Sequence, residues 1–105
     1  MQLSTFERIV LLNVLPKEGD FITLKFLQKL KEDLSFSEEE QKILQFRFEG
    51  EQVFWKPEGD KPKEITIGET MNSLIVITLK SLNEQKKLRD EHLPLYEKFM
   101  IPGGR

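Results

Sequence analysis

The sequence predicts a mostly α-helical protein with one β-hairpin, which is an α+β fold, and three observations predict it. Residues 70–88 carry apolar side chains at three- and four-residue spacing, the period of an α-helix. Two capping boxes that begin with serine mark the starts of further helices. Between residues 52 and 67 the apolar period changes to that of strands, with glycine and proline on either side.

Two helices are expected before residue 35. Ser4 and Glu7 form the first capping box, and Pro16 ends the helix that follows. The second helix opens after Asp20, or after Thr23 if that residue is the cap. Helical spacing predicts that its buried row consists of Leu24, Leu27, Leu30 and Leu34.

A short third helix is expected from Ser37 to about Phe46. Ser37 and Glu40 form the second capping box, and Glu38 and Glu39 add negative charge where the helix dipole favours it. The side chains expected to be buried in this helix are Ile43, Leu44 and Phe46.

The hairpin is expected to follow this helix. Its strands are residues 52–56 and 64–67, joined by the turn-rich residues 57–63. Val53 and Trp55 share one face of the first strand, and Phe54 lies on the other. We expect Trp55 to pack against the long helix that comes next in the chain, and Phe54 to point outward.

Residues 70–88 are the segment around which the other elements are expected to assemble. The apolar positions from Met71 to Leu82 recur at helical spacing, while Val76 and Ile77 lie outside that stripe. The helix should therefore be covered on more than one side. A strand is the alternative, because this segment is rich in β-branched residues.

A short last helix is expected from Leu93 to Met100, with Pro94 in its first turn. Residues 1–100 are expected to form one domain, because 105 residues suffice for a single modest core. Residues 101–105 are expected to be a flexible tail. Three helices, a hairpin, a long central helix and a short C-terminal helix give an order that begins like that of a winged-helix domain.

Composition limits the classes of function. Lys and Arg number 16 against 18 Asp and Glu, a net charge of −2, which gives no electrostatic reason for a polyanionic partner. The chain has no cysteine, which excludes thiolate chemistry, and His92 is the only histidine. No glycine-rich nucleotide-binding pattern occurs. We predict no enzymatic activity, no catalytic or metal-ligating residue, no cofactor and no small-molecule ligand.

A nucleic-acid-binding relative of winged-helix domains is the alternative interpretation. Its contacts would come from two groups of basic residues, Lys25, Lys29 and Lys31 on the second helix and Lys86, Lys87 and Arg89 after the long helix. The start of the third helix disfavours this interpretation, because phosphates would repel Glu38, Glu39 and Glu40.

The favoured interpretation is a small module that binds another protein or a second copy of itself. Phe54 is one interface candidate, because exposed aromatic side chains anchor interfaces. Leu11 and Leu12 are two more, because the first helix is apolar over a wide arc that a homodimer would bury. No membrane partner is expected, because no apolar run is longer than that of Leu74–Ile77, which is far shorter than the roughly 20 residues of a membrane span.

Three stretches support a resemblance: Leu15–Gly19 leading into Thr23–Lys25, then Glu51–Lys56, then Leu95–Phe99. Together they resemble a group of short uncharacterised proteins of bacteriophage and prophage type. The resemblance implies no activity and no site residues. It implies a bacterial, cytoplasmic setting, with phage or host macromolecules as partners.

Overall fold

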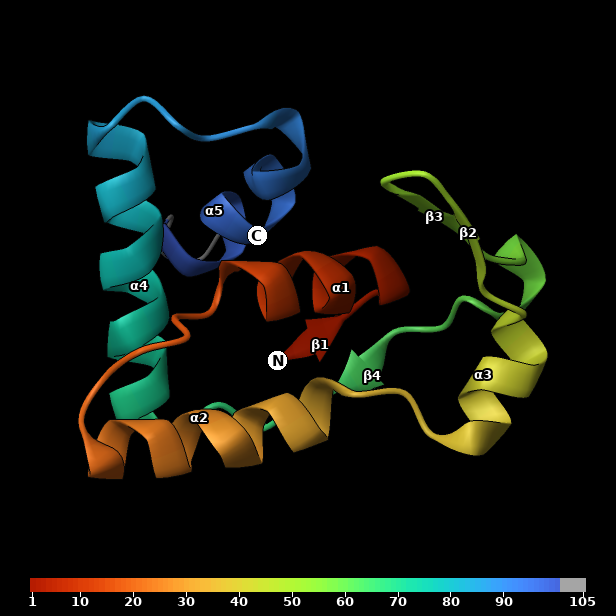
Figure 1. Cartoon of the computed structure of the whole chain (residues 1–105), viewed down its shortest axis with the longest axis horizontal. Helices are drawn as coiled ribbons and strands as arrows, with labels where there is room; N and C mark the ends of the chain where they lie inside the picture. The colour runs from red at the N-terminus through yellow and green to blue at the C-terminus, as the bar shows by residue number, and fades with distance from the viewer. Residues whose placement is uncertain (101–105) are drawn as a thin grey trace.

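A computed structural model describes residues 1–100 of the chain, and the tail expected at residues 101–105 lies outside the described residues. Five α-helices and four short strands occur among these residues (Figure 1). Their order is β1 (Gln2–Leu3), α1 (Thr5–Val14), α2 (Phe21–Leu34), α3 (Glu38–Leu44), β2 (Arg47–Glu49), β3 (Gln52–Phe54), the 3₁₀ turn η1 (Pro57–Gly59), β4 (Lys63–Glu64), α4 (Glu69–Glu84), the 3₁₀ turn η2 (Asp90–His92) and α5 (Leu93–Met100). The predicted fold class, mostly helical with one antiparallel hairpin, is confirmed.

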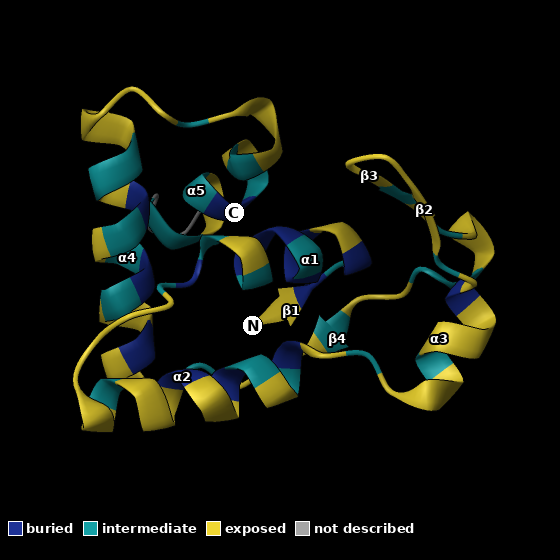
Figure 2. Cartoon of the chain, in the orientation of Figure 1, coloured by how far each residue is buried: buried dark blue, intermediate teal, exposed yellow. Residues whose placement is uncertain are grey.

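Helix α1 lies at the centre of the structure (Figure 1). It contacts β1, α2 and α5, whereas α4 runs along one side and contacts α2 and α5. The buried residues lie on the faces of these elements that are turned toward one another (Figure 2). They are Leu3, Val10, Leu11, Leu15, Leu27, Leu30, Leu34, Ile65, Met71, Ile75, Leu79 and Leu95. The prediction that residues 70–88 form the centre is therefore wrong, and α1 has that place.

Helix α4 confirms the helical interpretation of its segment, although it ends at Glu84, four residues earlier than expected. Lys86 follows with a positive φ of 59°, which takes the chain out of the helical conformation. Only one face of α4 is buried, that of Met71, Ile75 and Leu79. Ile77 is 63% exposed, so the expected cover on more than one side is wrong. The reason is the position of α4 at the edge of the molecule (Figure 1).

Both predicted capping boxes are present. The Ser4 hydroxyl accepts a hydrogen bond from the Glu7 amide at 3.1 Å, and the Glu7 carboxylate accepts one from the Ser4 amide at 2.9 Å. Ser37 and Glu40 make the same reciprocal pair at the start of α3. For α2 the cap is Asp20, because its carboxylate accepts the Thr23 amide at 2.8 Å.

The burial predicted for the second and third helices is only partly right. Leu27, Leu30 and Leu34 are buried, but Leu24 is exposed, as is Ile43 on α3. Helix α3 ends at Leu44 because Gln45 takes the left-handed conformation, and Phe46 lies half-buried beyond the helix. Helix α3 packs on η1 rather than on the main core, so only Leu44 is buried in it.

The hairpin pairs different strands from those expected. Strands β2 and β3 are joined by the two residues Gly50 and Glu51, and Gly50 supplies the positive φ of 63° that tight turns require. Residues Lys63–Glu64 form β4, which pairs antiparallel with Gln2–Leu3 instead of with residues 52–56. The expected pairing is wrong because residues 52–54 pair with the segment just before them in the chain, Arg47–Glu49. A turn of two residues is enough to join these two strands.

Candidate functional site

The side chain of Arg8 on α1 is only 1% exposed, although it carries a charge. Its Nε donates to the carbonyl of Leu34 at 3.1 Å, and its Nη2 donates to the carbonyl of Ser35 at 2.6 Å. Its Nη1 donates to the Glu40 carboxylate at 2.7 Å. Buried charges require such partners, and a cation is favoured at the carbonyl end of a helix. Arg8 therefore fastens the connection between α2 and α3 to α1.

Glu40 is the anionic partner in this arrangement. The hydrogen bond from Arg8 lowers the pKa of Glu40 from 4.5 to about 2, with help from the Ser37 amide and the positive charges of Arg8 and Lys63, while partial burial opposes the shift. The same carboxylate caps the first turn of α3 and pairs with α1. One side chain thus determines both where α3 begins and where it lies.

A chain of aromatic rings continues from Arg8 to the hairpin. The Arg8 guanidinium lies 3.9 Å from the ring centroid of Phe36. Phe36 meets Phe46 edge-on at 4.9 Å between centroids, and Phe46 lies 6.3 Å from Trp55. Trp55 lies 6.4 Å from Phe6, back on α1. The expected packing of Trp55 on the helix of residues 70–88 is therefore wrong, because Trp55 packs between the hairpin and α1.

Asp60 holds the Trp55 end of this row of aromatic rings in place. One of its carboxylate oxygens accepts the indole N–H of Trp55 and the other accepts the backbone amide of Thr5, both at 3.1 Å. Burial raises the pKa of Asp60, but the hydrogen bonds from Thr5 and Trp55 outweigh it and hold the pKa below its ordinary value. The arm formed by α3, β2 and β3 is thus tied to α1 at two places, by Glu40 and by Asp60.

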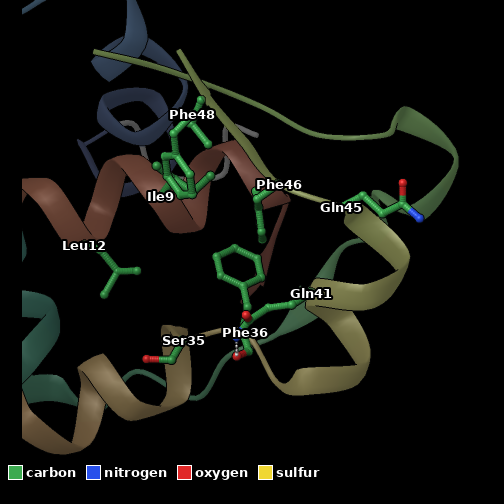
Figure 3. Close-up of a pocket in the computed structure, with 9 residues that line it drawn as sticks. Ile9, Leu12, Ser35, Phe36, Gln41, Gln45, Phe46 and Phe48 are labelled. Atoms are coloured by element: carbon green, nitrogen blue, oxygen red, sulfur yellow. Dashed lines mark hydrogen bonds between the residues drawn. The ribbon is translucent and has the colours of Figure 1, made fainter. Parts of the chain in front are cut away.

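An apolar groove of about 560 Å³ lies between α1 and this arm (Figure 3). Its lining has no charged side chain. The apolar lining residues are Ile9, Leu12, Phe36, Phe46, Phe48 and Val53, and the polar ones are Ser35, Gln41 and Gln45. Phe48 is 79% exposed at the edge of the groove. The site therefore combines an apolar hollow with a large aromatic side chain in water.

The three interface candidates lie in different places. Leu12 is half-buried and lines the groove. Leu11 is completely buried in the core, so its prediction as an interface residue is wrong. Phe54 is exposed, as expected, but it is paired in register with Arg47, whose guanidinium lies 5.3 Å from its ring centroid. Because Phe48 is one residue along from Arg47, Phe54 lies on the face of the hairpin opposite to the groove.

The two groups of basic residues lie far apart, one on α2 and the other beyond the end of α4 (Figure 1). Lys25 and Lys29 are exposed, whereas Lys31 is half-buried. The second group, Lys86, Lys87 and Arg89, is exposed and lines a polar hollow of about 760 Å³ that also contains Glu91 and His92. The structure does not bring these five lysines and Arg89 into one basic surface.

Arg8 and Phe48 are the residues of the candidate site that the sequence did not predict. Arg8 is in line with Leu11, Leu12 and Leu15 at helical spacing, and a charge within an apolar row indicates a buried pair. For Phe48 the signal was Gly50, since glycine between two short alternating segments is typical of a tight hairpin.

Comparison with protein-family models, with curated proteins and with solved structures finds no match for this chain. The relationship to bacteriophage and prophage proteins stays a prediction. Within residues 1–100, no three His, Asp or Glu side chains are grouped so that they could hold a metal ion. None of the helices in this range is long and apolar enough to cross a membrane.

Proposed function

We propose that this protein is a small non-enzymatic interaction module that binds a protein segment in the groove between α1 and the hairpin. Phe48 is the observation that carries the proposal. Its ring is 79% exposed beside an apolar hollow, although burying such a side chain is worth about 1.5–3 kcal/mol. A protruding aromatic side chain next to an apolar pocket is the usual arrangement of an interface anchor.

The fastening of the arm supports this role. Arg8 and Asp60 hold the two ends of the arm against α1, and both make several hydrogen bonds. A groove whose walls are fixed in advance loses less conformational entropy when it binds a partner. The groove also has the form that accepts an amphipathic helix, with apolar side chains from two sides and the polar side chains of Ser35, Gln41 and Gln45 among its lining.

The negative charge of the arm supports a protein partner over a nucleic acid. Glu38, Glu39 and Glu51 are exposed on the arm, where phosphates would be repelled. The nucleic-acid-binding interpretation and a cytoplasmic location stay predictions. We therefore expect the bound segment to be apolar, with basic residues on either side.

Selection of peptides from a random library tests the proposal. We expect enriched peptides to carry apolar residues at positions i and i+3 or i+4, and to bind the Phe48→Ser variant at least about tenfold more weakly than the natural chain. Phe54→Ser is the matched control, because it removes the same side chain from the opposite face of the hairpin. Peptides that bind Phe48→Ser as tightly as the natural chain would contradict the proposal, as would a selection without enrichment.

A further inference from the structure

A second exposed apolar surface lies at the start of α2. Phe21 is 75% exposed and Ile22 is 68% exposed, and both lie in the first turn of the helix. Lys25 and Lys29 follow Ile22 at positions i+3 and i+7, so these three side chains share the outward face. The opposite face of α2, which includes Leu27, packs into the core.

The charges of this surface are opposite to those of the arm. Residues 21–31 contain three lysines and no acidic residue, whereas residues 38–51 contain five acidic and two basic residues. Two of the five acids are already paired, Glu40 with Arg8 and Glu49 with Arg47. The remaining acids, Glu38, Glu39 and Glu51, are exposed, and Lys42 is the other basic residue of the arm.

One chain cannot bring these two surfaces together. The first turn of α2 lies at the lower left of Figure 1, and the arm with α3, β2 and β3 lies at the right, on the other side of α1. Because α2 is packed on α1 and on α4, its first turn cannot reach the groove of its own chain. A contact between the surfaces requires two molecules.

We infer that the groove binds the first three turns of α2 from a second copy of the chain. This inference rests on the proposed function and names its partner. Phe21 and Ile22 would enter the apolar hollow beside Phe48, and Lys25 and Lys29 would lie over the acidic arm. Such a contact joins two different surfaces, so it is heterologous, and repetition of it produces rings or open chains instead of a closed two-fold dimer.

Sedimentation velocity on the full chain tests this contact with two complementary variants. The groove variant is Phe48→Ser, and the α2 variant is Phe21→Ser combined with Ile22→Ser. All three side chains are exposed, so we expect both variants to keep the fold, which circular dichroism checks. The control variant is Ile77→Ser, which changes an exposed side chain on α4 that belongs to neither of the two surfaces.

We expect the natural chain and the Ile77→Ser control to form larger species as their concentration rises. Each of the other two variants alone should stay monomeric at those concentrations. An equimolar mixture of the two should give a heterodimer and nothing larger, because only one intact groove and one intact α2 surface are then available. Failure of the mixture to associate would overturn the inference.

Two other outcomes would overturn it in different ways. If the α2 variant associates as the natural chain does while Phe48→Ser does not, the groove pairs with itself in a two-fold dimer. If the natural chain is monomeric throughout, self-association is refuted, and peptide binding still decides the proposed function separately.

Salt and charge changes provide an independent readout. Added salt should weaken the association, because it screens exposed charges. Replacing Lys25 and Lys29 by Glu should weaken it by about threefold to tenfold, because each attraction to the acidic arm becomes a repulsion that solvent largely screens. Pairing this variant with a chain that carries Glu38→Lys and Glu39→Lys should restore it. If the strength of association depends neither on salt nor on these charge substitutions, α2 is refuted as the occupant of the groove.

Discussion

The pair of Arg8 and Glu40 allows a sharp prediction, through the variant Glu40→Gln. Glutamine keeps the shape of the side chain and can replace glutamate in a capping box, so the substitution removes mainly the charge. Lowering the pKa from 4.5 to about 2 corresponds to about 3 kcal/mol, at about 1.4 kcal/mol per pKa unit. The Glu40 side chain is 29% exposed, and solvent screening reduces this value. We expect Glu40→Gln to lower the free energy of unfolding by about 2–3 kcal/mol at pH 7.

The pH dependence of this difference follows from the direction of the shift. The folded-state pKa of Glu40 is depressed, so its contribution is fully present above the unfolded pKa of 4.5 and is lost as the pH falls toward about 2. The natural chain and the Glu40→Gln variant should therefore differ most at neutral pH. At about pH 2 the difference should shrink below about 0.5 kcal/mol.

Urea denaturation at several pH values measures this difference. Glu39→Gln is the matched control, because Glu39 is an exposed acid of the same helical turn that pairs with no basic group among the described residues. We expect Glu39→Gln to change the free energy of unfolding by less than about 0.5 kcal/mol. A Glu40→Gln effect that is equally large at pH 7 and pH 2, or no larger than that of Glu39→Gln, would refute the charge pairing.

Three further predictions concern stability and local structure. Leu79→Ala should cost about 2–5 kcal/mol in urea denaturation, because Leu79 is completely buried, and a loss below about 1 kcal/mol would contradict that burial. Asp60→Ala should cost about 1–3 kcal/mol and shift the fluorescence of Trp55, the only tryptophan, to longer wavelength; unchanged emission would contradict the indole hydrogen bond. Gly59→Ala should cost about 1–3 kcal/mol, because a Cβ there would clash with the side chain of Ile43 and lie 3.2 Å from its carbonyl oxygen. Ile43→Ala should recover part of that loss, and the absence of any recovery would argue against the clash.

Local signals in the sequence predicted the helices well. The capping boxes of Ser4 and Ser37 and the Asp20 cap are interactions over three residues, so the sequence pattern and the hydrogen bonds coincide. The helical interpretation of residues 70–88 was right for the same reason, since periodicity is a local property.

The surroundings of each element were harder to predict, because periodicity does not say what covers a helix. The apolar side chains around α4 suggested a central position, but Ile77 is exposed to water and α1 is central instead. Strand pairing failed similarly. The pairing of β4 with Gln2–Leu3 joins residues about sixty positions apart, and no local pattern specifies such a partner.

The candidate site was predicted only in part. Leu12 does line the groove, but Phe54 lies on the opposite face of the hairpin from Phe48, because the strand pairing differs from the expected one. A change of register or partner reverses which side chains share a face. The groove also depends on Arg8, whose partners come from residues 34–40, and only the folded structure brings them together.

Methyl NMR tests the central claim, that the groove is the contact surface, most directly. The probes are the methyl groups of Ile9 and Leu12 inside the groove and of Ile77 on α4, measured while a selected peptide is added. We predict that the Ile9 and Leu12 signals shift until the protein is saturated and that the Ile77 signal stays in place. Unchanged Ile9 and Leu12 signals at saturation would contradict the account.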